Sequence, residues 1–269
     1  MKVTLVSFTK PPVETVLWAE SAMHAETIPE KIVKIKGKKE RTEAERKIKN
    51  MLKSNFGTPL EYISTIWLLE DVSRALQTQL IRTRLASFSI QSMRCVPKDE
   101  FAKKHMYYIP EGIKKKGILK DFFVGGMLQI QDVYRLLRQY GASIEDARGI
   151  LPLNIYSTIT MCINFRSLSH LISDRLCLKA QGEIRKMAQE MRNEIKKKMD
   201  PILARSLLPP CLMTANCIME VENKEYLNSI NMKEKVCPLY ENFLKRERNI
   251  ALIKFLQIQK ERENAINPK

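Results

Sequence analysis

The chain has 269 residues, of which 44% are hydrophobic, enough for one sizeable globular domain and a small appendage. A formal net charge of +16 indicates anionic partners, and either nucleic acid or a polyphosphorylated small molecule would satisfy that field. Aromatic residues, at 7%, are few for a base-stacking surface, and no apolar stretch approaches the roughly 18 to 20 residues of a membrane span.

The first part of the chain predicts alternating strands and helices. The elements expected here are a strand at 2–9, helices at 13–25 and 31–49, a turn at 55–62 and a buried strand at 63–69. Lysine and glutamate four residues apart make the second helix a solvated one. Asp71 or Ser73 can cap a further helix. That helix would carry Gln79 and Arg82 at its C-terminal end.

The second part predicts fewer strands and longer helices. The elements expected here are an irregular basic segment at 96–125, a helix at 128–140, a strand at 156–163 and helices at 165–177 and 180–199. Gly141 ends the first of these helices. Asn164 stands where the strand meets the next helix, which is a typical N-cap position.

Residues 205–269 look like an extension added to a domain of residues 1–204, with a helix expected at 240–260. The six cysteines contain no Cys-x-x-Cys pair, and the three histidines show no metal-ligand spacing. Met1 leads directly into a strand-like pattern without the apolar region of a signal peptide. We therefore expect a cytoplasmic protein with reduced thiols and no metal site.

The segment from Arg82 to Arg94, R-T-R-L-A-S-F-S-I-Q-S-M-R, mixes arginines and serines with apolar residues. Arginine presents a planar fork of donors that matches phosphate geometry, and serine adds small neutral donors. A solvated basic loop is the usual alternative, but Leu85, Phe88 and Ile90 have no reason to line one. The pattern indicates a half-buried phosphate-binding segment.

The same segment resembles the signature of the flavin-dependent thymidylate synthases, Arg-His-Arg-x-x-Ser followed by Ser-x-Arg-Tyr. The positions kept at the family spacing are Arg82, Arg84, Ser87, Ser92 and Arg94. Three further stretches, at 57–61, 147–152 and 164–175, recur in that family in the same order. The resemblance covers roughly residues 1–200.

By this resemblance we expect an α+β fold with a central, mostly antiparallel sheet flanked by helices. The family assembles as a homotetramer whose active sites are shared between protomers. The implied reaction transfers a one-carbon unit from methylenetetrahydrofolate to C5 of dUMP and forms dTMP, with FAD and NADPH as redox cofactors. The implied partners are a deoxypyrimidine monophosphate and a folate, while the charge leaves nucleic acid open.

The resemblance also implies roles for single residues. Family positions that hold the nucleotide match Gln79, Arg82, Ser92, Arg94, Arg148 and Arg175, of which Arg148 would come from a neighbouring protomer. Positions that contact the flavin match Thr58, Glu61, Arg84, Asn164, Arg166 and His170. Arg175 matches the arginine at the pyrimidine ring, where it would stabilise charge across N3 and O4. Its place in an apolar stripe independently requires an anionic or carbonyl partner.

Three of these residues have simpler structural explanations. Asn164 can act as a helix cap and nothing else, and His170 can pair with Asp174 one turn later. Glu61 can be a surface charge at the end of a strand.

The sequence also departs from the family. Histidines of the family are replaced by Phe56, Tyr62 and Thr83, and the positions of its acidic or amide residue and its tyrosine hold Ile90 and Cys95. Nucleotide binding is therefore expected to be better preserved than flavin chemistry. Asp174 beside Arg175 offers an acceptor for the N4 donor of cytosine. Two alternatives remain: a dCMP or dUMP C5-methyl- or hydroxymethyltransferase on the same scaffold, or a non-catalytic descendant that binds nucleotides or nucleic acid.

Overall fold

The structure, a computed structural model, describes residues 1–27, 30–32, 34–54 and 56–214. The chain divides into two compact units, Met1–Leu207 and a second that begins at Leu208. The described part of the second unit contains the short helix α10 (Pro210–Thr214). The helix expected at 240–260 lies outside the described residues.

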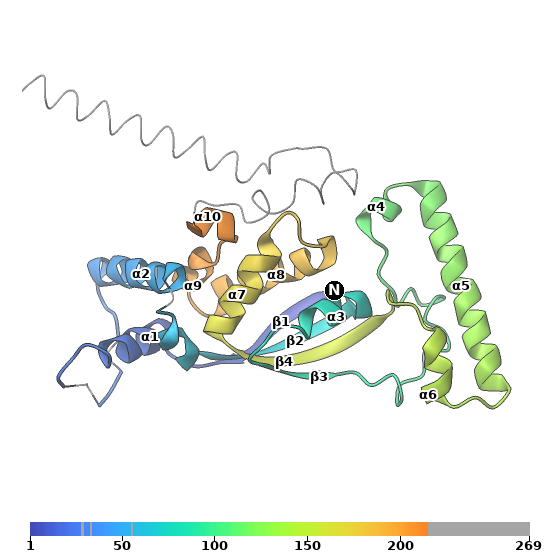
Figure 1. Cartoon of the computed structure of the whole chain (residues 1–269), viewed down its shortest axis with the longest axis horizontal. Helices are drawn as coiled ribbons and strands as arrows, with labels where there is room; N and C mark the ends of the chain where they lie inside the picture. Colours follow the sequence, from blue (N-terminus) through green and yellow to red (C-terminus); the bar gives the residue numbers. More distant parts are fainter. Residues whose placement is uncertain (28–29, 33, 55, 215–269) are drawn as a thin grey trace, which may run out of the picture. The chain divides into compact units, whose positions relative to one another are not determined.

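The first unit alternates strands and helices along the chain. Its elements are β1 (Lys2–Phe8), α1 (Pro12–Ser21), α2 (Lys38–Lys53), the 3-10 helix η1 (Thr58–Tyr62), β2 (Ser64–Ser73), α3 (Arg74–Leu80), β3 (Ala86–Ile90), α4 (Glu111–Lys114), α5 (Gly117–Gln139), α6 (Ile144–Ala147), the 3-10 helix η2 (Arg148–Ile150), β4 (Tyr156–Asn164), α7 (Phe165–Leu176), α8 (Gly182–Lys198) and α9 (Pro201–Ser206). Among the described residues, four strands form one antiparallel sheet in the order β1-β2-β4-β3 (Figure 1). The expected α+β fold with an antiparallel sheet is confirmed.

One face of the sheet is covered and the other is open. Side chains of a strand alternate between the two faces, so Trp67 and Leu69 of β2 are buried while Ile66 is exposed. In β4, Ile159 and Met161 are buried in the same way. Helices α7 and α8 lie over the covered face, where α7 contacts β4 and α8 contacts β1 (Figure 1).

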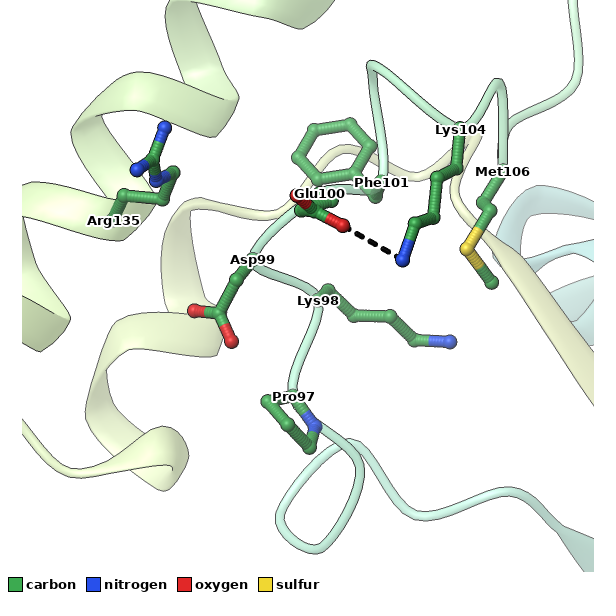
Figure 2. Close-up of a pocket in the computed structure, with 8 residues that line it drawn as sticks. All are labelled: Pro97, Lys98, Asp99, Glu100, Phe101, Lys104, Met106 and Arg135. Carbon is green, nitrogen blue, oxygen red and sulfur yellow. Dashed lines mark ion pairs between the residues drawn. The ribbon is translucent and has the colours of Figure 1, made fainter.

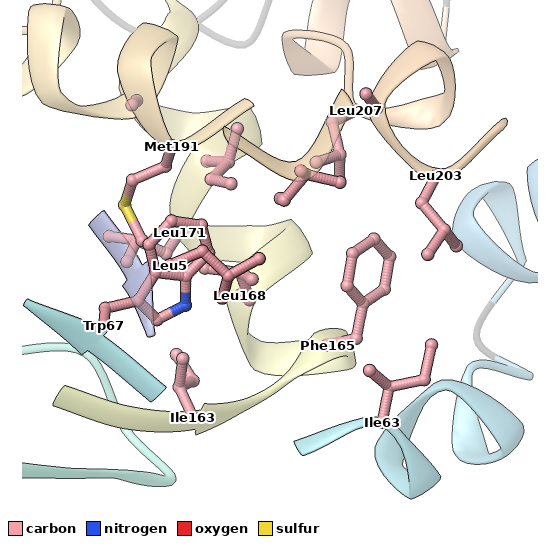
Figure 3. Close-up of a cluster of buried hydrophobic side chains, with 14 of the residues drawn as sticks. Leu5, Ile63, Trp67, Ile163, Phe165, Leu168, Leu171, Met191, Leu203 and Leu207 are labelled. Atoms are coloured by element: carbon pink, nitrogen blue, oxygen red, sulfur yellow. The ribbon is translucent and has the colours of Figure 1, made fainter. Parts of the chain in front are cut away.

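The main core lies between that face and the helices. Figure 3 shows Trp67 from β2 beside Leu168 of α7 and Met191 of α8, all fully buried. The indole Nε1 of Trp67 donates a hydrogen bond of 2.9 Å to Oγ1 of Thr65, which satisfies the one polar atom of the ring. This core fixes α7, the helix that carries most of the expected site residues.

A second buried cluster joins α5 to the segment that follows β3. Met127 and Tyr134 of α5 pack with Met93, Phe101 and Tyr107. No helix in the described part of the chain is long and apolar enough to cross a membrane.

The structure corrects several element boundaries. Helix α5 begins at Gly117, so the segment expected to be irregular at 96–125 is helical in its last part. Gly125 and Gly126 lie inside this helix and lower its intrinsic propensity, which hides its first half from a sequence-based prediction. The charged helix begins at Lys38, where Oε2 of Glu40 accepts a hydrogen bond from the backbone of Gly37.

Strand β3 and helices α4, α6 and α9 were not predicted at all. They have between four and six residues each, too few for a periodic pattern to identify. Of the two caps considered for α3, Ser73 is the actual one, because its Oγ accepts from the N–H of Leu76 at 3.0 Å.

Candidate functional site

The arginine-serine segment meets α7 in a pocket of about 330 Å³, here called the α7 pocket. The residues that line it are Arg82, Thr83, Arg84 and Leu85 from the segment before β3, and Ser167, His170, Leu171, Asp174 and Arg175 from α7. Four of the expected site residues therefore share one cavity: two from each element. Residues three and four apart on α7 face the same side, which explains why His170, Leu171 and Asp174 line it together.

Within the described residues, Arg175 has a buried polar atom without a hydrogen-bond partner in this pocket. Its Nε atom is buried, and no hydrogen-bond partner lies within reach among the described residues. A buried guanidinium nitrogen without an acceptor costs free energy that a ligand oxygen would recover. Arg82 and Arg84 form no ion pair or hydrogen bond in the described part of the chain either. The pocket thus presents three guanidinium groups with donors to spare.

The wall formed by Leu85 is strained. Leu85 has a positive φ of 57°, which is uncommon for a residue other than glycine, and the residue is 77% exposed. The left-handed backbone costs roughly 1–2 kcal/mol for a residue other than glycine. Strain of this kind persists where the surrounding structure holds it, and it is common at binding sites.

The other expected flavin positions lie at the N-terminus of α7. The side chain of Asn164 accepts a hydrogen bond of 2.9 Å from the N–H of Ser167, so the expected helix cap is present. Nη1 of Arg166 lies 2.6 Å from Oε1 of Glu61 in an ion pair. Thr58 begins η1 and is exposed.

Gly57 packs closely against the side chain of Arg166. A Cβ atom at Gly57 would lie 3.1 Å from Nε of Arg166, so any other residue there would require the Arg166 side chain to shift by a few tenths of an ångström. Because Glu61 pairs with Arg166, it is more than an isolated surface charge at the end of a strand. No hydrogen bond or ion pair joins His170 to Asp174 within the residues described, so the alternative role of His170 has no support from a contact.

The remaining nucleotide positions lie elsewhere. Ser92 and Arg94 line a separate cavity of about 650 Å³, here called the loop pocket. Nη2 of Arg94 is 2.7 Å from one carboxylate oxygen of Glu145, and Nη2 of Arg148 is 3.7 Å from the other. Glu145 therefore holds the two guanidinium groups on either side of one carboxylate.

Within one chain the expected nucleotide-binding residues thus fall into two groups. Arg82 and Arg175 line the α7 pocket, while Ser92 and Arg94 line the loop pocket, and the two linings have no residue in common. Gln79 lines neither pocket. Its amide donates to the carbonyl of Ala75 at 3.3 Å within α3.

Sequence reasoning missed two charged members of the loop pocket. Arg138 lines it from the end of α5, where Nη1 donates to the carbonyl of Ala142 at 2.6 Å. Glu145 joins arginines that are 51 and three residues away from it. The short separation from Arg148 on one helical turn was a usable signal, whereas the pairing with Arg94 depends on the tertiary structure.

Comparisons with known proteins identify the family of this chain. The family described as thymidylate synthase complementing protein matches residues 4–202. The flavin-dependent thymidylate synthase of Pyrococcus furiosus is 33% identical over 221 residues, which cover 81% of this chain and 89% of the relative. The enzyme of the same name from Clostridium tetani is 32% identical over 234 residues, with 81% of this chain and 90% of the relative covered.

Solved structures resemble the fold. Thymidylate synthase X from Helicobacter pylori with FAD and dUMP has a TM-score of 0.61 at 17% identity, covering 77% of this chain and 99% of that one. The UMP/dUMP methylase PolB from Streptomyces cacaoi, bound with 5-Br dUMP, has a TM-score of 0.59 at 21% identity, covering 76% of this chain and 93% of that one. Both identities are low, so the likeness concerns the fold. On the strength of the family match and of relatives above 30% identity, the chain belongs to the flavin-dependent thymidylate synthase family.

Proposed function

We propose that this chain transfers a one-carbon unit from methylenetetrahydrofolate to C5 of dUMP and forms dTMP, with FAD as cofactor and NADPH as reductant. Membership of a family whose curated members carry that activity in their name supports the reaction class. The observation that carries the proposal is the unsatisfied, buried Nε of Arg175 beside the unpaired guanidinium groups of Arg82 and Arg84. We assign the activity to residues 1–204, with 205–269 as an extension, and to the cytoplasm.

The nucleotide would bind between two protomers of a homotetramer. The α7 pocket of one protomer would provide Arg82 and Arg175, with Gln79 close by in sequence. The loop pocket of another would provide Ser92 and Arg94, together with Arg148. Guanidinium groups and a hydroxyl are suitable donors for a phosphate. In the absence of the ligand, Glu145 holds the guanidinium groups of Arg94 and Arg148 close to each other. A site divided in this way explains why the expected residues line two separate cavities in a single chain.

The residues at the α7 pocket fit a flavin nucleotide. Arg84 has free donors for a diphosphate, and His170 lines the cavity without a partner among the described side chains. Thr58, Glu61, Asn164 and Arg166 would hold the same cofactor at the N-terminus of α7. When bound, the flavin supplies the hydride that reduces the transferred carbon, after reduction by NADPH.

Arg175 would act on the pyrimidine itself. A guanidinium fixed in the α7 pocket would stabilise the negative charge that develops across N3 and O4 when C5 becomes nucleophilic. Because the α7 core holds the helix rigidly, the guanidinium needs little reorganisation during the reaction. The site requires no nucleophile from the protein, and none of the roles assigned here is covalent.

Asp174 favours a second candidate, a cytosine nucleotide as substrate. Its carboxylate lines the α7 pocket beside Arg175 and forms no ion pair within the described part of the chain. A carboxylate accepts a hydrogen bond from the N4 amino group of cytosine, whereas it repels the O4 of uracil. The Asp174 carboxylate would therefore favour binding of a cytosine nucleotide and disfavour binding of a uracil nucleotide.

The decisive experiment incubates the purified protein with methylenetetrahydrofolate, NADPH and either dUMP or dCMP and then determines the mass of the nucleotide product. We expect a yellow protein and a product that is dUMP plus a methyl group. A product from dCMP, or one that carries a hydroxymethyl group, would favour the second candidate. A colourless protein that takes up no added FAD would contradict both. Retention on DNA with a steep salt dependence would then favour a nucleic-acid-binding descendant.

A further inference from the structure

The segment from Gln91 to Lys98, here called the 91–98 loop, presents Ser92 and Arg94 to the loop pocket. At its start, the N–H of Gln91 donates to the carbonyl of Thr158 at 2.9 Å and continues the β3–β4 ladder by one bond. Inside the loop, the N–H of Val96 donates to the carbonyl of Ser92 at 3.2 Å. The N–H of Arg94 donates to Oγ of Ser92 at 3.2 Å. These bonds shape the loop locally, and they do not anchor its far end.

Lys98 closes the loop. Its Nζ donates a hydrogen bond of 3.2 Å to Oε1 of Gln91, so one side chain joins the last residue of the loop to the first. Its backbone N–H lies 3.4 Å from the hydroxyl oxygen of Tyr134, which is fully buried in α5. The loop is therefore anchored at both ends, to the sheet through Gln91 and to α5 through Lys98.

Burial disfavours the charged form of Lys98. The residue is 4% exposed and lines a cavity of about 390 Å³ together with Phe101, Met106 and the carboxylates Asp99 and Glu100 (Figure 2). No carboxylate forms an ion pair with it among the described residues. Glu100, which lines the same cavity, pairs with Lys104 at 2.7 Å instead. Burial consequently lowers the pKa of Lys98 below the usual range of a lysine.

A methionine would fill the same volume without the cost of desolvating an amine. The amine is therefore explained by the bond that it makes. That bond goes to the residue directly before Ser92, in the loop that also carries Arg94.

We propose that Lys98 is a positioning residue for nucleotide binding: by bonding Gln91 across the base of the 91–98 loop, it holds Ser92 and Arg94 in the orientation that receives the phosphate. The inference rests on the proposed function, in which this loop contacts the nucleotide. Lys98 acts through Gln91 and does not itself touch the substrate.

The test uses the full-length variants Lys98→Met and Gln91→Met, the double variant, and Lys104→Met as the matched control from the same cavity. Hydrogen exchange of the ligand-free proteins reports on the loop, and titration with dUMP reports on binding. In both single variants, the amides of residues 92–96 should exchange faster. The dissociation constant for dUMP should rise about tenfold, which corresponds to about 1.4 kcal/mol. The turnover number at saturating dUMP should stay close to that of the unmodified protein.

Three further results distinguish positioning from a structural role. The double variant should bind dUMP no worse than either single variant, because both remove the same bond. Lys98→Met should melt no earlier than the unmodified protein, since it removes a buried amine. Lys104→Met should change neither exchange nor affinity.

Unchanged exchange at 92–96 in Lys98→Met would overturn the inference, and so would faster exchange with unchanged affinity for dUMP. If the losses of dUMP affinity from the two single substitutions add up in the double variant, Lys98 does not act through its bond to Gln91. If the unmodified protein binds no dUMP, the proposed function fails, and the exchange data still decide whether Lys98 fixes the loop.

Discussion

Arg175 combines a polar atom that has no partner with a position on the rigid helix α7. Replacing it by alanine removes the guanidinium without disturbing a described hydrogen bond of Nε. We expect Arg175→Ala to lower the turnover number by about 100- to 1000-fold, the usual effect of deleting one fixed donor to a developing oxyanion. FAD should remain bound, because the role proposed for Arg175 is at the pyrimidine. Steady-state kinetics and the flavin absorbance of the purified variant measure both quantities.

Two variants control this prediction. Arg175→Lys keeps the charge but loses the planar fork, so it should recover only a small part of the activity. Arg46→Ala removes an exposed arginine that pairs with Glu43 on α2 and should leave turnover unchanged. Full activity in Arg175→Ala would remove the residue from the site.

Helix α7 tests whether Asn164 is a cap, a ligand contact or both. Asn164→Asp keeps a good N-cap, so the free energy of unfolding should stay within about 0.5 kcal/mol, whereas Asn164→Ala should lose about 1 kcal/mol. A carboxylate cannot donate a hydrogen bond as the amide does. Asn164→Asp should therefore weaken FAD binding about tenfold, equivalent to about 1.4 kcal/mol. Urea denaturation and FAD titration measure the two effects, and unchanged FAD affinity in the aspartate variant would leave Asn164 as a cap alone.

Helices α2 and α9 are joined by an ion pair that makes stability depend on pH. Nη2 of Arg205 lies 2.7 Å from Oε2 of Glu45, and this contact, with a smaller contribution from Lys49 on the same helix, lowers the pKa of Glu45 to about 2. Because the pKa in the folded state is depressed, the stabilisation is fully present above about 4.5, the ordinary value, and is lost as the pH falls toward 2. Glu45→Gln should cost roughly 1–2 kcal/mol at pH 7, less than the full shift implies because Arg205 is half exposed.

The difference between Glu45→Gln and the unmodified protein should shrink as the pH falls from about 4.5 to 2. Urea denaturation at several pH values measures it. Glu43→Gln on the same helix is the control, since its pair with Arg46 is exposed and should add nothing measurable. A difference that persists unchanged at low pH would contradict the assignment to the Glu45–Arg205 pair.

Local sequence patterns were sufficient to predict those helices and strands whose secondary structure depends on their own residues. Strand β4, the cap at Asn164 and helix α7 follow from alternation, a capping residue and helical spacing, and the structure confirms all three. The first half of α5 and strand β3 could not be predicted in this way. Strand β3 pairs with β4, which lies 71 residues away in sequence at Ser89 and Thr160, and α5 contains two adjacent glycines.

The same distinction applies to the site. Helical spacing predicted His170 and Asp174 on one face of α7 and Arg175 on another, and the structure brings all three to the α7 pocket. The contact of Arg94 with Glu145 spans 51 residues and depends on how α5 and α6 pack. No local pattern contains that information.

At the scale of the whole molecule, the first unit carries surfaces that suit association with further copies. Helix α5 exposes large apolar side chains, among them Ile118 at 69%, Phe122 at 73% and Leu136 at 50%. Apolar exposure of this extent on one helix is typical of a protein interface. It supports the proposed homotetramer, in which the α7 pocket and the loop pocket of different protomers would meet.

Mixing two inactive variants tests this shared site. Arg175→Ala damages the α7 pocket, and Arg94→Ala damages the loop pocket. If each active site takes one pocket from each of two protomers, co-refolded mixtures contain sites in which both pockets are intact. In an equal mixture, about half of the α7 pockets and about half of the loop pockets are intact. About a quarter of the sites therefore combine two intact pockets, and about a quarter of the wild-type activity should return. If both pockets of one site belong to the same chain, every site keeps one damaged pocket and the mixture stays as inactive as its components.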